Sequence, residues 1–224
     1  MEKEGTVALS TAGAGYAWPV PIRFFGQLIS FVFHPLFIPS YIATFIIYVD
    51  PYAFAGMTDK ARLFKLISVI FSTAFLPLFS VALMKQLGFI QSIYLRSQKD
   101  RIIPYIVCMI FYFWAWYVSR NLHDSPSLVA MLLAVFLSCI AGMMANIYYK
   151  ISMHGIAAGV LLVLFTWMAF NGMFLPGFWL AAAMFVTGLI CTARFIVSDH
   201  SSFEIYSGLL VGALCQLVSL GIAV

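Results

Sequence analysis

Charged residues are scarce in this chain: only 9% of its 224 residues are Asp, Glu, Lys or Arg. A soluble domain averages about 25% charged residues, whereas 63% of the residues here are hydrophobic. The mean hydropathy of +1.01 agrees with this balance. The composition therefore excludes an ordinary soluble domain and predicts an integral membrane protein. The small net charge of +4 belongs to cationic loops, so no nucleic-acid partner is expected.

Three further absences narrow the class of protein. The chain lacks the alternation of polar and apolar residues that outer-membrane barrels require. Its continuous apolar runs instead predict helices, which satisfy their own backbone hydrogen bonds in lipid. The four cysteines all lie inside apolar runs, without disulfide or metal-ligand spacing, so they are expected to be small buried hydrophobic residues. Residues 1–22 lack the apolar core of a cleavable signal peptide.

Seven apolar stretches approach the length of about 20 residues that crosses a hydrocarbon core. They are Phe24–Val49, Phe64–Met84, Ile103–Val118, Leu128–Tyr148, Gly155–Met173, Pro176–Arg194 and Ile205–Val224. We therefore predict an all-α integral membrane bundle of about six to seven transmembrane helices, forming one domain over 24–224 after a flexible segment 1–23. Pro35 and Pro39 predict a kink or irregular turn in the first stretch, and Pro104 is expected in the first turn of the third helix.

Polar residues collect in three connecting segments, Arg96–Pro104, Lys150–Gly155 and Arg194–Glu204. Two predicted spans separate each segment from the next. Because an even number of crossings returns a chain to the same side, all three segments are predicted to share one membrane face, and the candidate site lies there. Gly208 and Gly212 form a small-xxx-small pair, which predicts close packing of the last helix.

The orientation of this face stays open. The face is predicted to carry eight of the twelve Lys and Arg residues, and such an excess indicates the cytoplasmic side. Five of the eight belong to the candidate site itself, however, and without them the count is three cations against four. The five are Arg96, Lys99, Arg101, Lys150 and Arg194.

Two short patterns in these segments carry the functional hypothesis. Arg194 is followed after five residues by His200 and after three more by Glu204. Ser152 and His154 stand together at the predicted start of a helix. Arginine offers a planar fork of donors suited to phosphate oxygens, and histidine is the side chain that exchanges protons near neutral pH. Cations and histidines at a membrane edge predict a site for a lipid phosphate.

These residues resemble the type 2 phosphatidic acid phosphatase superfamily, the lipid phosphatases related to vanadium haloperoxidases. The third motif of that family is Ser-Arg, five residues, His, three residues, Asp. Arg194 and His200 occupy the corresponding places here, while Ala193 replaces the serine and Glu204 replaces the aspartate. The resemblance covers about residues 95–215, with the motifs in the family's order.

The other two motifs match in part. Ser152 and His154 correspond to the family's second motif, Pro-Ser-Gly-His, whose proline and glycine are replaced here. The first motif, Lys, six residues, Arg-Pro, is the weakest match. Pro104 is preceded by isoleucine, and Lys99 and Arg101 are assigned to this motif by their chemistry and neighbourhood rather than by their spacing.

The resemblance implies a phosphatase that needs no metal or other cofactor and works through a phosphohistidine. His200 would be the nucleophile, Glu204 would orient its ring, and His154 would protonate the leaving oxygen and later activate water. Phosphate binding would fall to Arg194, Ser152, Arg101, Lys99 and Lys150. Phosphatidic acid, phosphatidylglycerol phosphate and polyprenyl diphosphate are candidate substrates, and the expected location is the inner membrane of a bacterium.

Simpler interpretations stay open beside this one. The loop cations could be topology signals or residues that extend to the membrane interface, Ser152 could be only a helix N-cap, and Glu204 could pair with Arg194. His34 and His123 fit no motif and are expected to be structural. At the level of function, the alternatives are a lipid phosphotransferase and a non-catalytic protein that binds or transports a lipid phosphate. The oligomeric state is not predicted.

Overall fold

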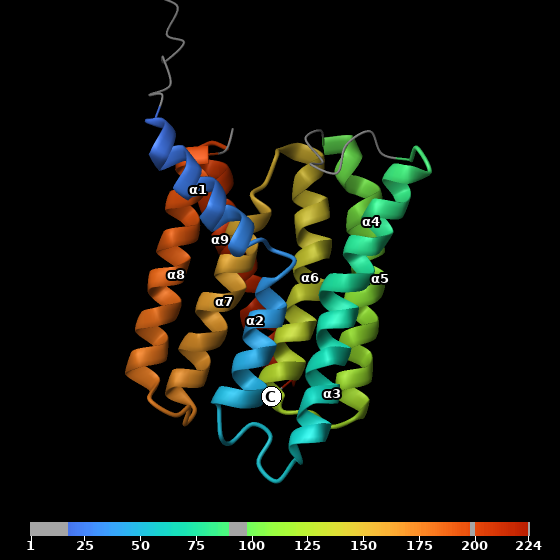
Figure 1. Ribbon diagram of the computed structural model, residues 1–224, viewed down its shortest axis with the longest axis vertical. Helices are drawn as coiled ribbons and strands as arrows, with labels where there is room; N and C mark the ends of the chain where they lie inside the picture. Colours follow the sequence, from blue (N-terminus) through green and yellow to red (C-terminus); the bar gives the residue numbers. More distant parts are fainter. Residues whose placement is uncertain (1–17, 90–97, 198–199, 224) are drawn as a thin grey trace, which may run out of the picture.

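The computed structural model describes residues 18–89, 98–197 and 200–223, and the side chains of 98–101 lie outside this description. Within these ranges, every regular element is helical. Six helical segments are long and apolar enough to cross a membrane: Asp59–Gln86, Ile102–Asn121, Pro126–Tyr148, Met153–Phe170, Pro176–Val197 and Ser202–Ala223. The protein is therefore an all-α membrane bundle, as its sequence predicts (Figure 1).

The predicted first span is not one helix. It divides into α1 (Val20–Val32), α2 (Ile38–Thr44) and a π-helical turn, η1 (Phe45–Val49). In Figure 1, α1 lies obliquely across one end of the bundle, and α2 runs from there toward the opposite end. Pro35 lies in the break, where its missing N–H costs no helical hydrogen bond. Helix α1 also begins inside the segment 1–23 that was expected to be flexible, and residues 1–17 lie outside the described part.

Two prolines are accommodated in different ways. Pro77 lies in the first turn of α4 (Leu76–Gln86), which continues α3 (Asp59–Ile70) through the π-helical turn η2 (Phe71–Phe75). Pro104 lies inside α5 (Gln98–Asn121) rather than in its first turn, so that expectation was wrong. Helix α5 begins in the polar segment before the apolar run, because a helix can continue beyond the hydrocarbon core into the membrane interface.

The remaining four helices are close to their predicted bounds: α6 (Pro126–Tyr148), α7 (Met153–Phe170), α8 (Pro176–Val197) and α9 (Ser202–Ala223). Helices α7 and α9 pack through glycines on both sides. A Cβ on Gly208 would lie 2.6 Å from the carbonyl oxygen of Ser152, and a Cβ on Gly155 would lie 2.6 Å from that of Ile205. The predicted close packing of α9 is therefore confirmed, and it holds the N-terminal ends of α7 and α9 together.

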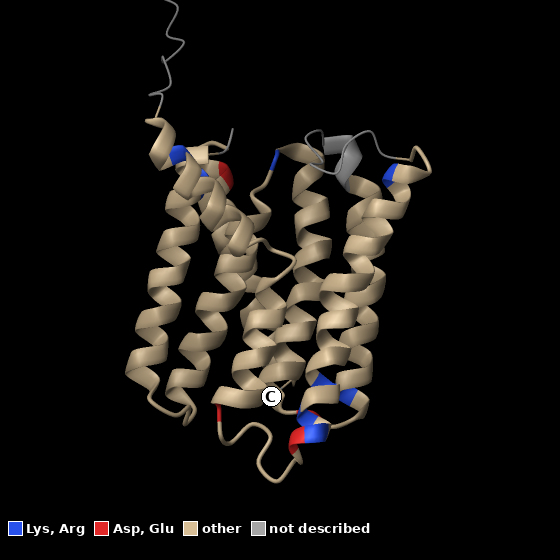
Figure 2. Cartoon of the chain, in the orientation of Figure 1, with Lys and Arg blue, Asp and Glu red and all other residues tan. Residues whose placement is uncertain are grey.

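The described parts of the three polar segments do share one end of the bundle. Helices α6 and α8 end there, and α5, α7 and α9 begin there (Figure 1). The charged residues that the structure describes gather at the two ends, and the middle of the bundle carries none (Figure 2). This distribution fits a hydrocarbon core bounded by two polar interfaces. We call the end that holds the start of α7 and the end of α8 the motif end.

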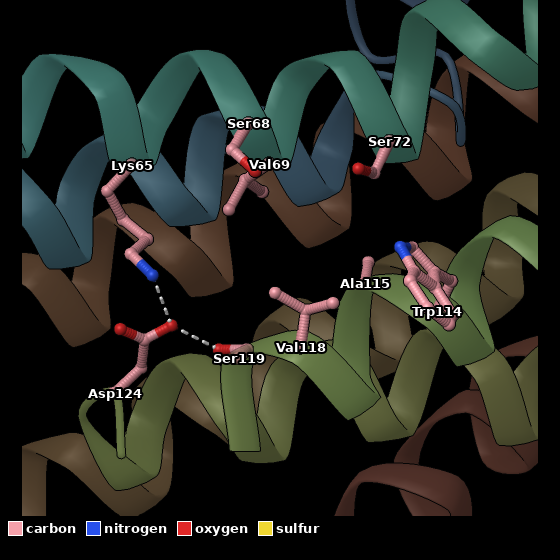
Figure 3. A pocket seen from close by; sticks show the side chains of 9 residues that line it. All are labelled: Lys65, Ser68, Val69, Ser72, Trp114, Ala115, Val118, Ser119 and Asp124. Carbon is pink, nitrogen blue, oxygen red and sulfur yellow. Dashed lines mark hydrogen bonds and ion pairs between the residues drawn. The ribbon is translucent and has the colours of Figure 1, made fainter. Parts of the chain in front are cut away.

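The opposite end contains a buried ion pair. Lys65 Nζ of α3 lies 2.9 Å from Asp124 Oδ2, in the turn between α5 and α6. The same carboxylate oxygen accepts a hydrogen bond of 2.6 Å from the Ser119 hydroxyl (Figure 3). The Asp124 side chain is 3% exposed and that of Lys65 is 14% exposed. A small cavity of about 60 Å³ lies beside the pair, and the three side chains join α3 to the α5–α6 hairpin.

Candidate functional site

A cavity of about 830 Å³ lies inside the bundle at the motif end. Its walls come from the helices α1, α2, α4, α5, α6, α7 and α8. The polar part includes Gln27, Ser30, His34, His154, Arg194 and His200. The apolar part includes Ile42, Leu78, Val81, Val135, Cys139 and Val160. One cavity therefore combines a cationic, histidine-rich part with an apolar part inside the membrane.

The pairing of His200 with Glu204 was predicted from the sequence, and the structure contains it. His200 Nδ1 lies 3.2 Å from Glu204 Oε2. Because an ionised carboxylate only accepts, Nδ1 carries the proton and Nε2 carries the lone pair. Burial lowers the pKa of His200 below 6.5; the hydrogen bond from its ring to Glu204 raises it in part, and the charge of Arg194 lowers it again. The ring is therefore neutral at neutral pH, with a free lone pair on Nε2.

Glu204 also closes the first turn of α9. Its Oε2 accepts a hydrogen bond of 2.8 Å from the Ser201 N–H, and its own N–H donates to Ser201 Oγ at 3.3 Å. This reciprocal arrangement is a capping box, in which Ser or Thr at the N-cap pairs with Glu or Gln three residues later. The first turn of α9 thus holds in place the carboxylate that contacts His200.

His154 contacts a helix end that lies far away in the sequence. Its Nε2 lies 3.0 Å from the carbonyl oxygen of Ser30, in the last turn of α1. A carbonyl oxygen only accepts, so Nε2 carries the proton and the neutral ring has its lone pair on Nδ1. This carbonyl is one of the acceptors that the end of a helix leaves without an intrahelical partner. His154 therefore stabilises the end of α1 and still keeps one nitrogen that can exchange a proton.

Arg194 supplies the positive charge shared by this site. One terminal nitrogen lies 3.4 Å from Ser30 Oγ, on the same residue whose carbonyl accepts from His154. The guanidinium is close enough to act electrostatically on His154, His200 and His34. Helix α1 is positioned for this contact because Gly26 packs directly against Val197 at the end of α8.

His34 belongs to this site, although sequence analysis set it aside as structural. Its ring centroid lies 5.5 Å from that of His154, with the two planes at 82°. It lines the same cavity as His154, Arg194 and His200. The signal that could have identified it is its position: an ionisable residue inside an apolar stretch of a membrane protein is a candidate functional residue by default.

The other predicted phosphate ligands lie in different positions. Ser152 is fully buried, and its hydroxyl caps α7 by accepting the Gly155 N–H at 3.3 Å. Its N–H donates to the Glu204 carbonyl at 3.1 Å, which links α7 to α9. Lys150 is half-buried and close enough to act on His200 electrostatically. Neither residue is among those that line the cavity.

The side chains of Lys99 and Arg101 lie outside the described part of the chain, and so does all of Arg96. The structure therefore describes neither cationic side chain that sequence analysis assigned to the first motif, whereas Pro104 lines the cavity. His123, the other histidine without a motif, is exposed in the turn after α5 at the opposite end.

Among the described residues, no three His, Cys, Asp or Glu side chains gather closely enough to hold a metal ion. The three histidines of the site are each engaged by a different group, namely Glu204, the Ser30 carbonyl and the backbone N–H of Leu36.

Comparison of the chain with protein-family models, with curated proteins and with solved structures found no match in any of the three.

Proposed function

We propose that this protein is a membrane-embedded phosphatase that removes phosphate from a lipid through a phosphohistidine intermediate. Membership of the type 2 phosphatidic acid phosphatase superfamily is part of the proposal. So is a location in the inner membrane of a bacterium. The observation that carries the proposal is the cavity of about 830 Å³, which joins Arg194 and three histidines to an apolar interior.

A lipid phosphate has the two parts that this cavity accommodates. Its head group is an anion, which an arginine binds through charge-assisted hydrogen bonds. Its hydrocarbon chain fits an apolar wall, which offers the chain surroundings like those of the bilayer interior. A soluble sugar phosphate would leave the apolar part unfilled, and an uncharged lipid would gain nothing from the positive charge of Arg194. The cavity therefore favours an amphiphilic phosphate.

The histidine geometry suggests how the reaction would proceed. His200 Nε2 attacks phosphorus, and the bond from phosphorus to the lipid oxygen breaks. The leaving oxygen takes a proton from Nδ1 of a protonated His154, which becomes neutral. Water then gives a proton to that nitrogen and attacks the phosphohistidine, so that inorganic phosphate leaves and His200 is restored. Arg194 stabilises the charge on the transferring group throughout.

The contacts of both catalytic histidines are compatible with these roles. Glu204 keeps the proton of His200 on Nδ1, which leaves Nε2 as the attacking nitrogen. The Ser30 carbonyl accepts from Nε2 of His154 in both protonation states of that ring. Proton exchange at Nδ1 of His154 therefore does not break its contact with α1.

Phosphate release by the purified protein tests the proposal. We expect hydrolysis of at least one substrate from a panel of phosphatidic acid, lysophosphatidic acid, phosphatidylglycerol phosphate and polyprenyl diphosphate. Substrate with a radioactive phosphoryl group should label the protein on histidine, and His200→Gln should remove the label and the activity. His123→Asn is the matched control, because His123 lies in the turn between α5 and α6, and this turn is at the opposite end (Figure 1).

Three results would separate the alternatives. Labelling followed by transfer to an added alcohol, without release of phosphate, would indicate a phosphotransferase. Saturable binding of a lipid phosphate without labelling would indicate a binding or transport protein. No binding and no hydrolysis across the panel would overturn the proposed function itself.

A further inference from the structure

We propose that His34 contacts the substrate in this site, as a neutral imidazole whose Nε2–H donates to a phosphate oxygen. The inference rests on the proposed function and adds a residue that none of the three motifs contains. His34 lines the cavity that Arg194, His154 and His200 also line. Its ring lies 5.5 Å from that of His154, measured between centroids.

The turn between α1 and α2 holds His34 in place. The carbonyl oxygen of His34 accepts hydrogen bonds from the N–H groups of Phe37 at 2.8 Å and Ile38 at 3.3 Å. Ile38 begins α2 and is 2% exposed, so the turn is anchored to the buried core. Pro35 follows His34 directly and restricts the backbone of both residues. The imidazole therefore projects from a rigid part of the chain.

The tautomer of His34 follows from one hydrogen bond. The backbone N–H of Leu36 donates to His34 Nδ1 at 3.3 Å. A backbone N–H cannot accept, so Nδ1 carries the lone pair and the proton is on Nε2. Protonation of Nδ1 would break this bond and would add a positive charge near Arg194. His34 is thus held as a neutral ring with one N–H to donate.

His34 and His154 differ in the direction of their hydrogen bonds, and this difference gives the two neighbouring rings different roles. His154 donates to a carbonyl, and that hydrogen bond is retained when the ring takes up a second proton. His34 accepts from an N–H, and its hydrogen bond is lost when the ring takes up a second proton. His154 is therefore suited to proton transfer, and His34 is suited to a fixed hydrogen bond. A neutral histidine can polarise an oxygen by donating a fixed hydrogen bond to it in this way.

Among the described residues, no acceptor is hydrogen-bonded to the Nε2–H of His34, which is exposed where it lines the cavity. Within this part of the chain, the hydrogen bonds and ring contacts of His34 are the Leu36 hydrogen bond at Nδ1, the backbone bonds of the turn and the contacts with Phe37 and His154. An anion held by Arg194 would bring acceptor oxygens into the same part of the cavity. The ligand chemistry is a phosphate oxygen, whether it belongs to a lipid head group or to free phosphate.

Two substitutions test the hydrogen-bond donor at Nε2 of His34 separately from the imidazole ring as a whole. In His34→Gln, the amide nitrogen can occupy the place of Nε2 and donate. In His34→Asn, the amide oxygen can replace Nδ1 as the acceptor for Leu36, but no donor reaches the Nε2 position. His123→Asn is the matched control, because asparagine tolerates the left-handed backbone at that position, φ 53°.

The experiment measures the dissociation constants of inorganic phosphate and of dodecyl phosphate for the full chain in detergent. We expect His34→Asn to weaken both by roughly tenfold or more, as for the loss of one hydrogen bond to a charged group. His34→Gln should stay within about threefold of the parent, and His123→Asn should match it. Weaker binding of dodecyl phosphate alone would assign His34 to the chain-binding part and overturn the inference, as would parental affinity in His34→Asn.

A measurement on the parent protein covers the case in which His34→Asn does not fold. The ¹⁵N signals of the histidine rings, assigned through His34→Gln, should show Nδ1 of His34 unprotonated and Nε2 protonated. Inorganic phosphate should shift the Nε2–H signal, and an unmoved signal overturns the inference. If the parent hydrolyses lipid phosphates while His34 does not respond, only this inference fails. If the parent neither binds nor hydrolyses them, the proposed function fails with it.

Discussion

Glu204 holds His200 with the same carboxylate oxygen that closes the first turn of α9. Oε2 of Glu204 lies 3.2 Å from His200 Nδ1 and 2.8 Å from the Ser201 N–H. The longer side chain of glutamate can reach back to the N-cap residue, as capping boxes require. A glutamate at this position therefore both contacts the histidine and caps the helix.

The first prediction concerns this carboxylate. Glu204→Gln should lower the rate of phosphate release by roughly ten- to a thousandfold, because the charge that orients and polarises His200 is lost. Stability should change little, because glutamine also functions in a capping box. Ser201→Ala is the complementary control: it removes the hydroxyl cap and should cost about 1 kcal/mol of stability while retaining more of the rate. An unchanged rate in Glu204→Gln would exclude a role for Glu204 in activating His200.

The second prediction concerns pH. Burial lowers the pKa of His200, so its nucleophilic lone pair should persist below pH 6.5. The measurement is the rate at which a small electrophile alkylates His200 as a function of pH. The acid limb of this pH–rate profile should lie below pH 6.5. Glu204→Gln removes a group that raises this pKa, so the limb should move to lower pH. Lys150→Met removes a positive charge that lowers it, so the limb should move to higher pH. Shifts in the opposite directions would contradict the assignment.

The same pKa shift has a consequence for stability. The folded protein holds His200 neutral, and the unfolded chain binds a proton near pH 6.5. The contribution of His200 to the free energy of unfolding is therefore present above pH 6.5 and is lost as the pH falls through the folded-state pKa. His200→Gln should reduce the loss of stability on acidification, as measured by thermal unfolding in detergent between pH 7 and pH 5.

The third prediction concerns His154. His154→Gln keeps a donor for the Ser30 carbonyl but has no nitrogen that exchanges a proton, so the end of α1 should stay in place. Hydrolysis of an alkyl phosphate should fall by about a hundredfold or more, whereas an aryl phosphate should be affected less, because its leaving group needs no protonation. Parallel assays of the two substrates provide the test. Equal losses on both would indicate that His154 only positions α1.

The fourth prediction concerns the contact between α7 and α9. Gly208→Ala places a methyl group 2.6 Å from the Ser152 carbonyl, which must separate the ends of the two helices. Overpacking of this kind costs about 1–3 kcal/mol, and the rate should fall because His154 and His200 move apart. Gly188→Ala on α8 is the control, since an added Cβ there meets no atom within 4 Å. Equal effects at both positions would contradict this account.

The fifth prediction concerns the ion pair at the opposite end. Lys65→Met leaves the Asp124 carboxylate buried without its cation and should destabilise the protein by about 3–5 kcal/mol. The double variant Lys65→Met/Asp124→Leu should recover much of this loss, because no unpaired charge remains. Thermal unfolding in detergent measures both. The turnover of each folded variant should match the parent, because the pair lies at the other end of the bundle (Figures 1 and 3).

The sequence by itself determined the membrane class, six of the seven predicted spans and the single face shared by the polar segments. Each of these depends on local properties: apolar length sets the spans, and the parity of crossings sets the face. The contact of His200 with Glu204 was also predicted: His200 lies just before α9 and Glu204 lies in its first turn, so a separation of four residues keeps the two side chains close. The tight approach of α7 and α9 was signalled by Gly208 and Gly212, since only small residues let two backbones come so close.

Only the tertiary structure decided the composition of the site. Ser30 contacts His154 across 124 positions and Arg194 across 164, and no local pattern encodes contacts at such separations. The break after Val32 brings α1 over the motif end and turns His34 into the cavity, whereas a continuous first span would have placed that ring along a helix. Local periodicity specifies which residues are helical and which are buried. The packing of distant helices specifies which side chains meet, because that depends on how all their surfaces fit together.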